Sequence, residues 1–304
     1  MALQVQLVLS GGGVNGLAMV GAVAALEKLG VRPVRYAGTS SGAMVAALLA
    51  SGYESSALER ILSQICVRRM LGIQVGMLWR GKQWWKLIRG EGWIDGKRME
   101  QWMRMMLLAK RVRTFADLPK HTLHIVATNL TTQQMVVLPD DCDEDMDIAK
   151  AVRMSASIPF VFDPVAYRGS YYVDGFILSN TPLLALQTMD GVGNLPVVVL
   201  TFGESEPNSS VRWDAQKKSD QFNRRQQMPA SMGGIFGTIH ALFGTMIAAH
   251  DRYWMERHPE IIHLRLPTNG IKPTDFFIKP DEMKKLMNSG AEAAVQQWMQ
   301  KTSV

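Results

Sequence analysis

Two strand-to-helix transitions within the first 50 residues constrain the fold of this 304-residue chain more than any other feature. Residues 3–9 alternate in polarity as a strand does, and a glycine cluster then leads into the alanine-rich stretch 15–29. A second β-forming stretch, 34–37, passes through another glycine-containing turn into the apolar segment 43–50. The order strand, helix, strand, helix is typical of a parallel sheet with helices on its faces.

The rest of the chain shows no separate linker and no internal repeat. Its apolar content of 47% and charged content of 20% are those of a folded globular protein. Further strands are predicted at 121–129, 135–138, 165–167, 171–173, 196–202 and 261–266, and a last amphipathic helix near 280. We expect one domain over residues 1–304, with lid or cap segments at 70–95 and 204–258.

The second glycine-containing turn, Gly38-Thr39-Ser40-Ser41-Gly42, matches the pattern G-x-S-x-G. Between a strand and a helix this pattern predicts a nucleophile elbow, a sharp turn that exposes its central serine, here Ser40. Gly38 and Gly42 are required because side chains there would clash with the tightly turned backbone. Ser40 would lie at the N-terminus of the following helix, whose dipole stabilises a developing oxyanion.

The first glycine cluster, Gly11-Gly12-Gly13-Val14-Asn15-Gly16, supports two interpretations. It matches the dinucleotide-binding pattern G-x-G-x-x-G, but such a site expects an acidic residue after the second strand, where the elbow occurs instead. As an oxyanion hole, the backbone N–H groups of Gly11, Gly12 and Gly13 would point at a substrate carbonyl oxygen, which side chains would obstruct. We favour the oxyanion hole and keep a dinucleotide-binding protein as an alternative.

A serine nucleophile needs a base, because its hydroxyl is weakly nucleophilic until a neighbour accepts the proton. Asp174-Gly175 follows a predicted strand, so the Asp174 carboxylate can project from the same sheet edge as Ser40. A triad in the α/β-hydrolase order Ser-Asp-His would instead use a later histidine. The candidates are His240, His250, His258 and His263. Only two strands precede Ser40, and no candidate lies in a recognisable strand-end loop, which argues against the triad.

The formal net charge of +6 suits an anionic partner, either phospholipid headgroups or nucleic acid. The two cysteines, Cys66 and Cys142, lack CxxC spacing and predict neither a disulfide framework nor a zinc site. The first ten residues contain no basic leader, so we expect no signal peptide and a cytoplasmic protein.

The glycine loop, the G-x-S-x-G elbow and Asp174-Gly175 occur in the order found in the patatin-like phospholipase family, which this chain resembles. The resemblance covers most of residues 5–202, including Ala-Ser-Ile-Pro at 156–159, and more weakly 276–290. It implies an α/β fold of three layers, α/β/α, with a mainly parallel central sheet. It also implies a Ser40–Asp174 dyad that hydrolyses fatty-acyl esters of membrane lipids or lysolipids through an acyl-enzyme. No cofactor, metal or nucleic acid is implied.

Two residues depart from the family pattern. The family often carries Arg or Lys before the last glycine of the loop, where the cation can meet a phosphate, whereas this chain has Asn15. A small residue usually follows Asp-Gly, whereas Phe176 would alter how the aspartate is held or narrow the pocket. Asn15 and Phe176 are therefore candidate substrate contacts. They also motivate an alternative function, a non-catalytic lipid-binding or acyl-binding protein on the same fold.

Two further segments bear on membrane contact. Residues 77–93 combine four tryptophans with basic residues, which is typical of a membrane-surface contact and equally of a cap over the core. Residues 233–250 are apolar over a near-spanning length, but their glycines and two histidines favour a cap or interface helix. We expect a peripheral membrane contact, with a homo-oligomer, an activating partner and delivery to another cell as open alternatives.

Overall fold

A computed structural model describes residues 2–73, 94–140, 143–187, 195–203, 245 and 257–302. Most of both expected lid segments, 70–95 and 204–258, lies outside these residues. The tryptophan-rich segment 77–93 and the residues His240, His250 and Cys142 also lie outside them, as does the stretch 233–250 apart from Thr245.

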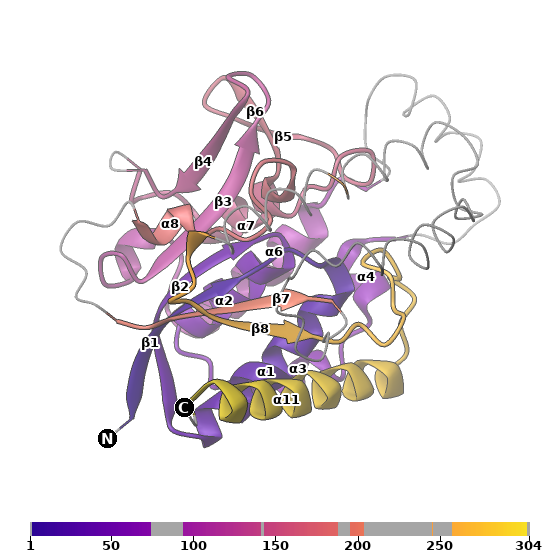
Figure 1. Cartoon of the computed structure of the whole chain (residues 1–304). Helices are drawn as coiled ribbons and strands as arrows, with labels where there is room; N and C mark the ends of the chain where they lie inside the picture. Colours follow the sequence, from indigo (N-terminus) through magenta and orange to yellow (C-terminus); the bar gives the residue numbers. More distant parts are fainter. Residues whose placement is uncertain are drawn as a thin grey trace, which may run out of the picture.

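Eight strands form one sheet in the order β5-β6-β3-β2-β1-β7-β8, with β4 paired to β3 (Figure 1). The strands are β1 (Leu3–Leu9), β2 (Val31–Thr39), β3 (Leu123–Asn129), β4 (Gln134–Leu138), β5 (Val165–Tyr167), β6 (Ser170–Asp174), β7 (Val197–Phe202) and β8 (Ile262–Leu266). The pairings from β3 through β2, β1 and β7 to β8 are parallel, whereas β4, β5 and β6 join the sheet antiparallel. The expected α/β fold with a mainly parallel sheet is confirmed.

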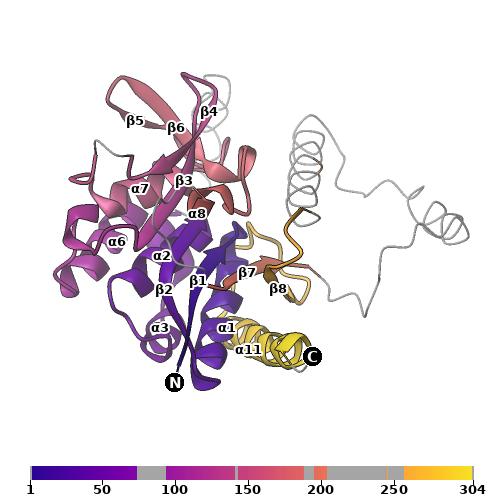
Figure 2. The same ribbon diagram turned by 60° about the vertical axis from the view of Figure 1, so that its left-hand side comes forward.

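Most of the described helices pack on one face of this sheet. They are α1 (Gly16–Lys28), α2 (Ser41–Ala50), α3 (Ser55–Leu62), α6 (Lys97–Ala109), α7 (Ile148–Ser155) and α11 (Pro280–Thr302). Helices α1 and α11 run close together in both views (Figure 1, Figure 2). Gly21 and Gly290 permit this approach, because a Cβ on either one would overlap the backbone of the other helix.

The other face of the sheet carries a smaller apolar core. There the short helix α8 (Leu184–Gln187) contributes Ala185 and Leu186 to a cluster with Val8, Ala37 and Val126 of three neighbouring strands. Helices therefore flank the sheet on both faces. No helix within the described ranges is both long enough and apolar enough to cross a lipid bilayer.

Strand β3 aligns the ends of two other strands. Thr39, the last residue of β2, pairs with Val126, and Asp174, the last residue of β6, pairs with the adjacent Ala127. Both strands pair with the same edge of β3, because β4 pairs with the opposite edge. Since β2 runs parallel to β3 and β6 antiparallel to it, the carboxyl ends of β2 and β6 meet head to head.

Candidate active site

Ser40 lies between the end of β2 and the start of α2, in a backbone conformation that L-residues rarely adopt. Its φ of 56° and ψ of −123° are strained for a non-glycine residue. The flanking glycines allow this turn to form: a Cβ on Gly38 would lie 2.5 Å from the Gly42 carbonyl oxygen, and one on Gly42 would overlap the Leu9 carbonyl. The strand, sharp turn and helix expected around Ser40 are therefore present.

The Ser40 hydroxyl faces the carboxylate of Asp174. Ser40 Oγ donates a hydrogen bond of 2.6 Å to Asp174 Oδ2, and the Phe176 N–H donates one of 3.0 Å to Asp174 Oδ1. Asp174 is completely buried. Burial raises the pKa of Asp174 from 3.8 to about 7, although the hydrogen bonds from Ser40 and Phe176 lower it and so limit the rise. The structure thus places a serine hydroxyl against a carboxylate with raised basicity.

The N–H groups of the three loop glycines differ in their hydrogen-bond partners. The Gly11 N–H donates to the Asn180 carbonyl at 3.1 Å, and the Gly12 N–H donates to Ser41 Oγ at 3.1 Å. The Gly13 N–H has no hydrogen-bond partner among the described residues, and Gly13 lines the adjacent cavity. The N–H groups of Gly11 and Gly12 are therefore already hydrogen-bonded within the protein, and the use of this loop as an oxyanion hole stays a prediction.

Asn15 does not reach the cavity. Its side chain is 2% exposed, and its Nδ2 donates to the Ile271 carbonyl oxygen at 3.2 Å. The N–H of the preceding residue, Val14, donates to the Pro273 carbonyl oxygen at 3.0 Å and joins the same two segments. Asn15 thus anchors the glycine loop to residues 271–273 and is not part of the described cavity lining, and its role as a substrate contact stays a prediction.

Phe176 acts on the site through its backbone. Its N–H holds Asp174 Oδ1, as described above, in the first turn of a 3-10 helix at Gly175–Ile177. Its ring is not among the described side chains that line the cavity. Any residue with an N–H would make this contact, and the expected narrowing of the pocket by the Phe176 ring stays a prediction.

An apolar cavity opens beside Ser40. Apart from Ser40 and Ser41, its described lining consists of apolar side chains and glycines. The larger of these side chains are Leu17, Met44, Leu48, Leu62, Ile65, Met99, Trp102, Phe162 and Phe276. They come from α1, α2, α3, α6 and three loops, so no single sequence pattern marked them, and sequence reasoning did not identify this cavity.

The two described candidate histidines lie away from the dyad. His263 is on β8, where its Nε2 lies 2.6 Å from Thr201 Oγ1, and burial lowers its pKa to about 4. His258 pairs with Glu260 at 2.9 Å. Neither contacts Ser40 or Asp174. The described residues also contain no group of three or more His, Cys, Asp or Glu side chains that could hold a metal ion.

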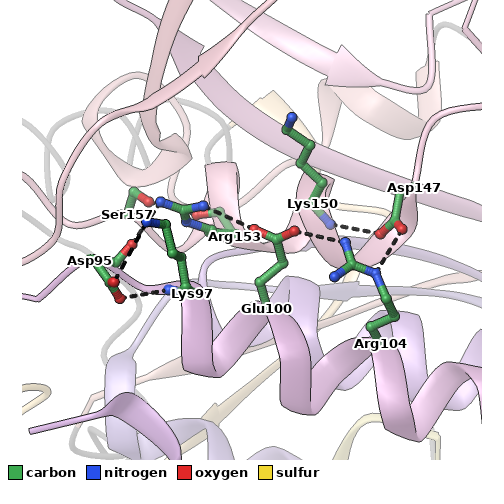
Figure 3. Close-up of polar contacts among 8 residues, drawn as sticks. All are labelled: Asp95, Lys97, Glu100, Arg104, Asp147, Lys150, Arg153 and Ser157. Atoms are coloured by element: carbon green, nitrogen blue, oxygen red, sulfur yellow. Dashed lines mark hydrogen bonds and ion pairs between the residues drawn. The ribbon is translucent and has the colours of Figure 1, made fainter.

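A ladder of ion pairs joins α7 to α6 near the site (Figure 3). Glu100 accepts hydrogen bonds from Arg153 at 3.0 Å and from Arg104 at 2.7 Å, and Arg104 donates to Asp147 at 3.0 Å. Arg153 also donates to the Asp95 carbonyl oxygen at 2.6 Å. The side chains of Arg153 and Glu100 are only 13% and 14% exposed. The ladder therefore ties α7, which ends at Ser155, to α6.

Comparison with known proteins gives a consistent result. The family model described as patatin-like phospholipase matches residues 7–186. The uncharacterized protein YqhO of Bacillus subtilis (strain 168) is 33% identical, over 96% of this chain and 98% of YqhO. The probable lipid hydrolase 463L of Invertebrate iridescent virus 6 is 29% identical, over 58% of this chain and 61% of the viral protein. VipD from Legionella pneumophila has a similar fold, with a TM-score of 0.56, 18% identity and coverage of 97% of this chain and 66% of VipD.

Proposed function

Because the chain belongs to the patatin-like phospholipase family, we propose that it is a serine lipid acyl hydrolase that cleaves fatty-acyl esters of phospholipids or lysolipids. The observation that carries the proposal is the 2.6 Å hydrogen bond from Ser40 to Asp174 beside an apolar cavity. A hydroxyl, a buried carboxylate and an apolar chamber are what an acyl transfer from a lipid requires.

In the proposed reaction Ser40 Oγ attacks the ester carbonyl carbon while Asp174 Oδ2 accepts the hydroxyl proton. A general base works best when its pKa is near the operating pH, and burial brings the pKa of Asp174 to about 7. The proton then passes to the oxygen of the leaving alcohol, and an acyl ester of Ser40 remains. Water, deprotonated by Asp174, attacks this ester and releases the fatty acid, which restores the Ser40 hydroxyl.

The oxyanion of each tetrahedral intermediate needs hydrogen-bond donors in place before the reaction. Gly13 provides an N–H without a partner among the described residues, beside the cavity that Ser40 also lines. The N-terminal turn of α2, directly after Ser40, adds N–H groups that the helix itself does not use. We assign the oxyanion to these groups and give the N–H groups of Gly11 and Gly12, which are already hydrogen-bonded, a structural role.

The cavity is the proposed site of the acyl chain. Its aliphatic and aromatic walls exclude water, and burying each methylene of a chain contributes about 0.8 kcal/mol. No cationic side chain lines the described part of the cavity, and Asn15 is buried in the loop anchor. We therefore propose that the acyl chain rather than a phosphate dominates substrate recognition, and that the enzyme meets its substrates at a membrane surface.

Fatty-acid release from defined lipids tests the function. Vesicles of phosphatidylcholine and phosphatidylglycerol, and micelles of lysophosphatidylcholine, are incubated with the wild type and with Ser40→Ala, and free fatty acids are measured by mass spectrometry. The exposed Ser56 provides a matched control, Ser56→Ala. We expect release by the wild type and the control and none by Ser40→Ala. Lipid binding without any Ser40-dependent release would instead support an acyl-binding protein.

A further inference from the structure

Ser155, the last residue of α7, places its hydroxyl between two strands of the sheet. Its Oγ accepts a 2.9 Å hydrogen bond from the Ser40 N–H and donates one of 2.6 Å to the Val126 carbonyl oxygen. Ser155 is completely buried. A single hydroxyl therefore bridges the backbones of β2 and β3 at the point where their pairing ends.

This bridge provides a hydrogen-bond acceptor for a backbone N–H that the sheet itself does not pair. The register of β2 with β3 ends at Thr39 and Val126, and the next residue, Ser40, turns away with a φ of 56°. A buried N–H at this point requires a partner, because an unpaired one costs as much as a lost hydrogen bond. The Ser155 hydroxyl supplies this partner and so supports a strained conformation.

The same turn of chain also holds the other half of the dyad. The Ser157 carbonyl oxygen accepts a 2.9 Å hydrogen bond from the Asp174 N–H. Ser157 Oγ, by contrast, donates only within its own helix region, to the Arg153 carbonyl at 2.7 Å (Figure 3). Residues 155–157 therefore contact the backbones of both Ser40 and Asp174, and α7 is itself fixed by the Arg153–Glu100 pair.

We propose that Ser155 is a positioning residue for the Ser40–Asp174 dyad: its hydroxyl fixes the Ser40 N–H so that Ser40 Oγ faces Asp174 Oδ2. The role rests on the proposed hydrolase function. Ser155 does not line the cavity, so it acts on Ser40 and leaves the acyl chain untouched. Its removal should therefore lower kcat and change KM little.

Ser155→Ala and Ser51→Ala form a matched pair, because each removes one buried serine hydroxyl that donates to a backbone carbonyl oxygen and leaves the backbone in place. We expect kcat for fatty-acid release to fall about 10- to 100-fold in Ser155→Ala, since small misplacements of a reacting group have effects of this size. Ser51→Ala should stay within about twofold of the wild type, because its hydroxyl donates to the Leu48 carbonyl oxygen and to neither Ser40 nor Asp174. Thermal midpoints measured alongside separate the loss of activity from a loss of folded protein.

Threonine and valine have nearly the same shape and differ in the hydroxyl. Comparing Ser155→Thr with Ser155→Val therefore separates the effect of the hydroxyl from the effect of side-chain shape. Threonine should retain several-fold more activity than valine. The acid limb of the pH profile gives an independent signature: a displaced Ser40 no longer donates to Asp174, which raises the pKa of Asp174 and moves the limb to higher pH in Ser155→Ala. Equal activity of the threonine and valine variants, or a kcat of Ser155→Ala within twofold of the wild type, would overturn the role of Ser155. A wild type without Ser40-dependent hydrolysis would overturn the proposed function as well.

Discussion

Ser40 Oγ and Asp174 Oδ2 are joined by a 2.6 Å hydrogen bond, although 134 residues separate them in the chain. The sheet brings them together, because Thr39 and Asp174 pair with the adjacent residues Val126 and Ala127 of β3. The dyad geometry is therefore a consequence of register in the central sheet. A shift of β6 by one residue along β3 would turn the carboxylate to the other face of the sheet.

The rate of hydrolysis should depend on pH through Asp174. As the base, Asp174 must be ionised, and its pKa is about 7. We expect kcat/KM for a non-ionising ester to fall about tenfold per pH unit below this value and to level off above it. The measurement is a pH–rate profile from pH 5 to 9. A profile that is flat between pH 5 and 8 would contradict the assignment of Asp174 as base.

Asp174→Asn should abolish hydrolysis and yet stabilise the fold at neutral to alkaline pH. The pKa of Asp174 is raised from 3.8 to about 7, so the folded wild type holds a proton that the unfolded chain releases, and its stability falls as pH rises between these values. Asparagine has no ionisable group, so the Asp174→Asn variant does not lose stability in this way as pH rises. Urea unfolding at pH 8 should show a gain of a few kcal/mol in the free energy of unfolding. The gain should shrink steadily at pH 6 and pH 5, and a pH-independent difference would count against the raised pKa.

How far the sequence predicts this site depends on whether a contact is local. Ser40 could be predicted because the strand, both glycines and the helix lie within a few residues of it. Over such a short stretch, the residue types alone show which positions the steric limits of a sharp turn restrict. Asp174 could not be paired with Ser40 by local reasoning, since their contact depends on strand register. Its position at a strand end allowed the pairing, but the pairing itself was expected mainly from family resemblance.

Other differences between the sequence-based expectations and the structure also arise from contacts that are not local in the sequence. Gly11 and Gly13 look alike in sequence, but the Asn180 carbonyl, 169 residues away, occupies only the Gly11 N–H. Asn15 resembles a substrate contact in the sequence, but in the structure its side chain donates to the Ile271 carbonyl oxygen, 256 positions away. Strand β2 begins at Val31, earlier than expected, because a shift in register between Val5 and Gln6 of β1 accommodates proline at position 33.

Filling the cavity should change chain-length preference. Met44 lies on α2 one turn beyond Ser40 and lines the cavity, so Met44→Trp takes up space that a long acyl chain needs. We expect kcat/KM to fall at least about tenfold for p-nitrophenyl palmitate and to change little for p-nitrophenyl butyrate. Met105→Trp is the control, because Met105 is exposed on α6. Equal losses on both esters would argue against an acyl-chain site.

The ladder between α6 and α7 should contribute to stability more than exposed pairs do. Arg153→Met leaves Glu100 largely buried and short of a partner, and we expect it to lower the free energy of unfolding by about 3 kcal/mol. Lys97→Ala removes only an exposed pair with Asp95, 4.0 Å long, and should cost less than about 0.5 kcal/mol. Chemical denaturation of the two variants checks the contrast, and similar costs would show that the ladder is no more important than a surface pair.

In the proposed mechanism Ser40 carries the acyl group during turnover, with Asp174 as its base. The most direct measurement is rapid acid quench of the wild type during hydrolysis of a long-chain ester, followed by peptide mass spectrometry. We predict an acyl adduct on the peptide that contains Ser40, in the same amount as the alcohol released in the initial burst of the reaction. Neither Ser40→Ala nor Asp174→Asn should carry an adduct. Full-rate hydrolysis by Ser40→Ala, or an acyl group on another residue, would contradict the account.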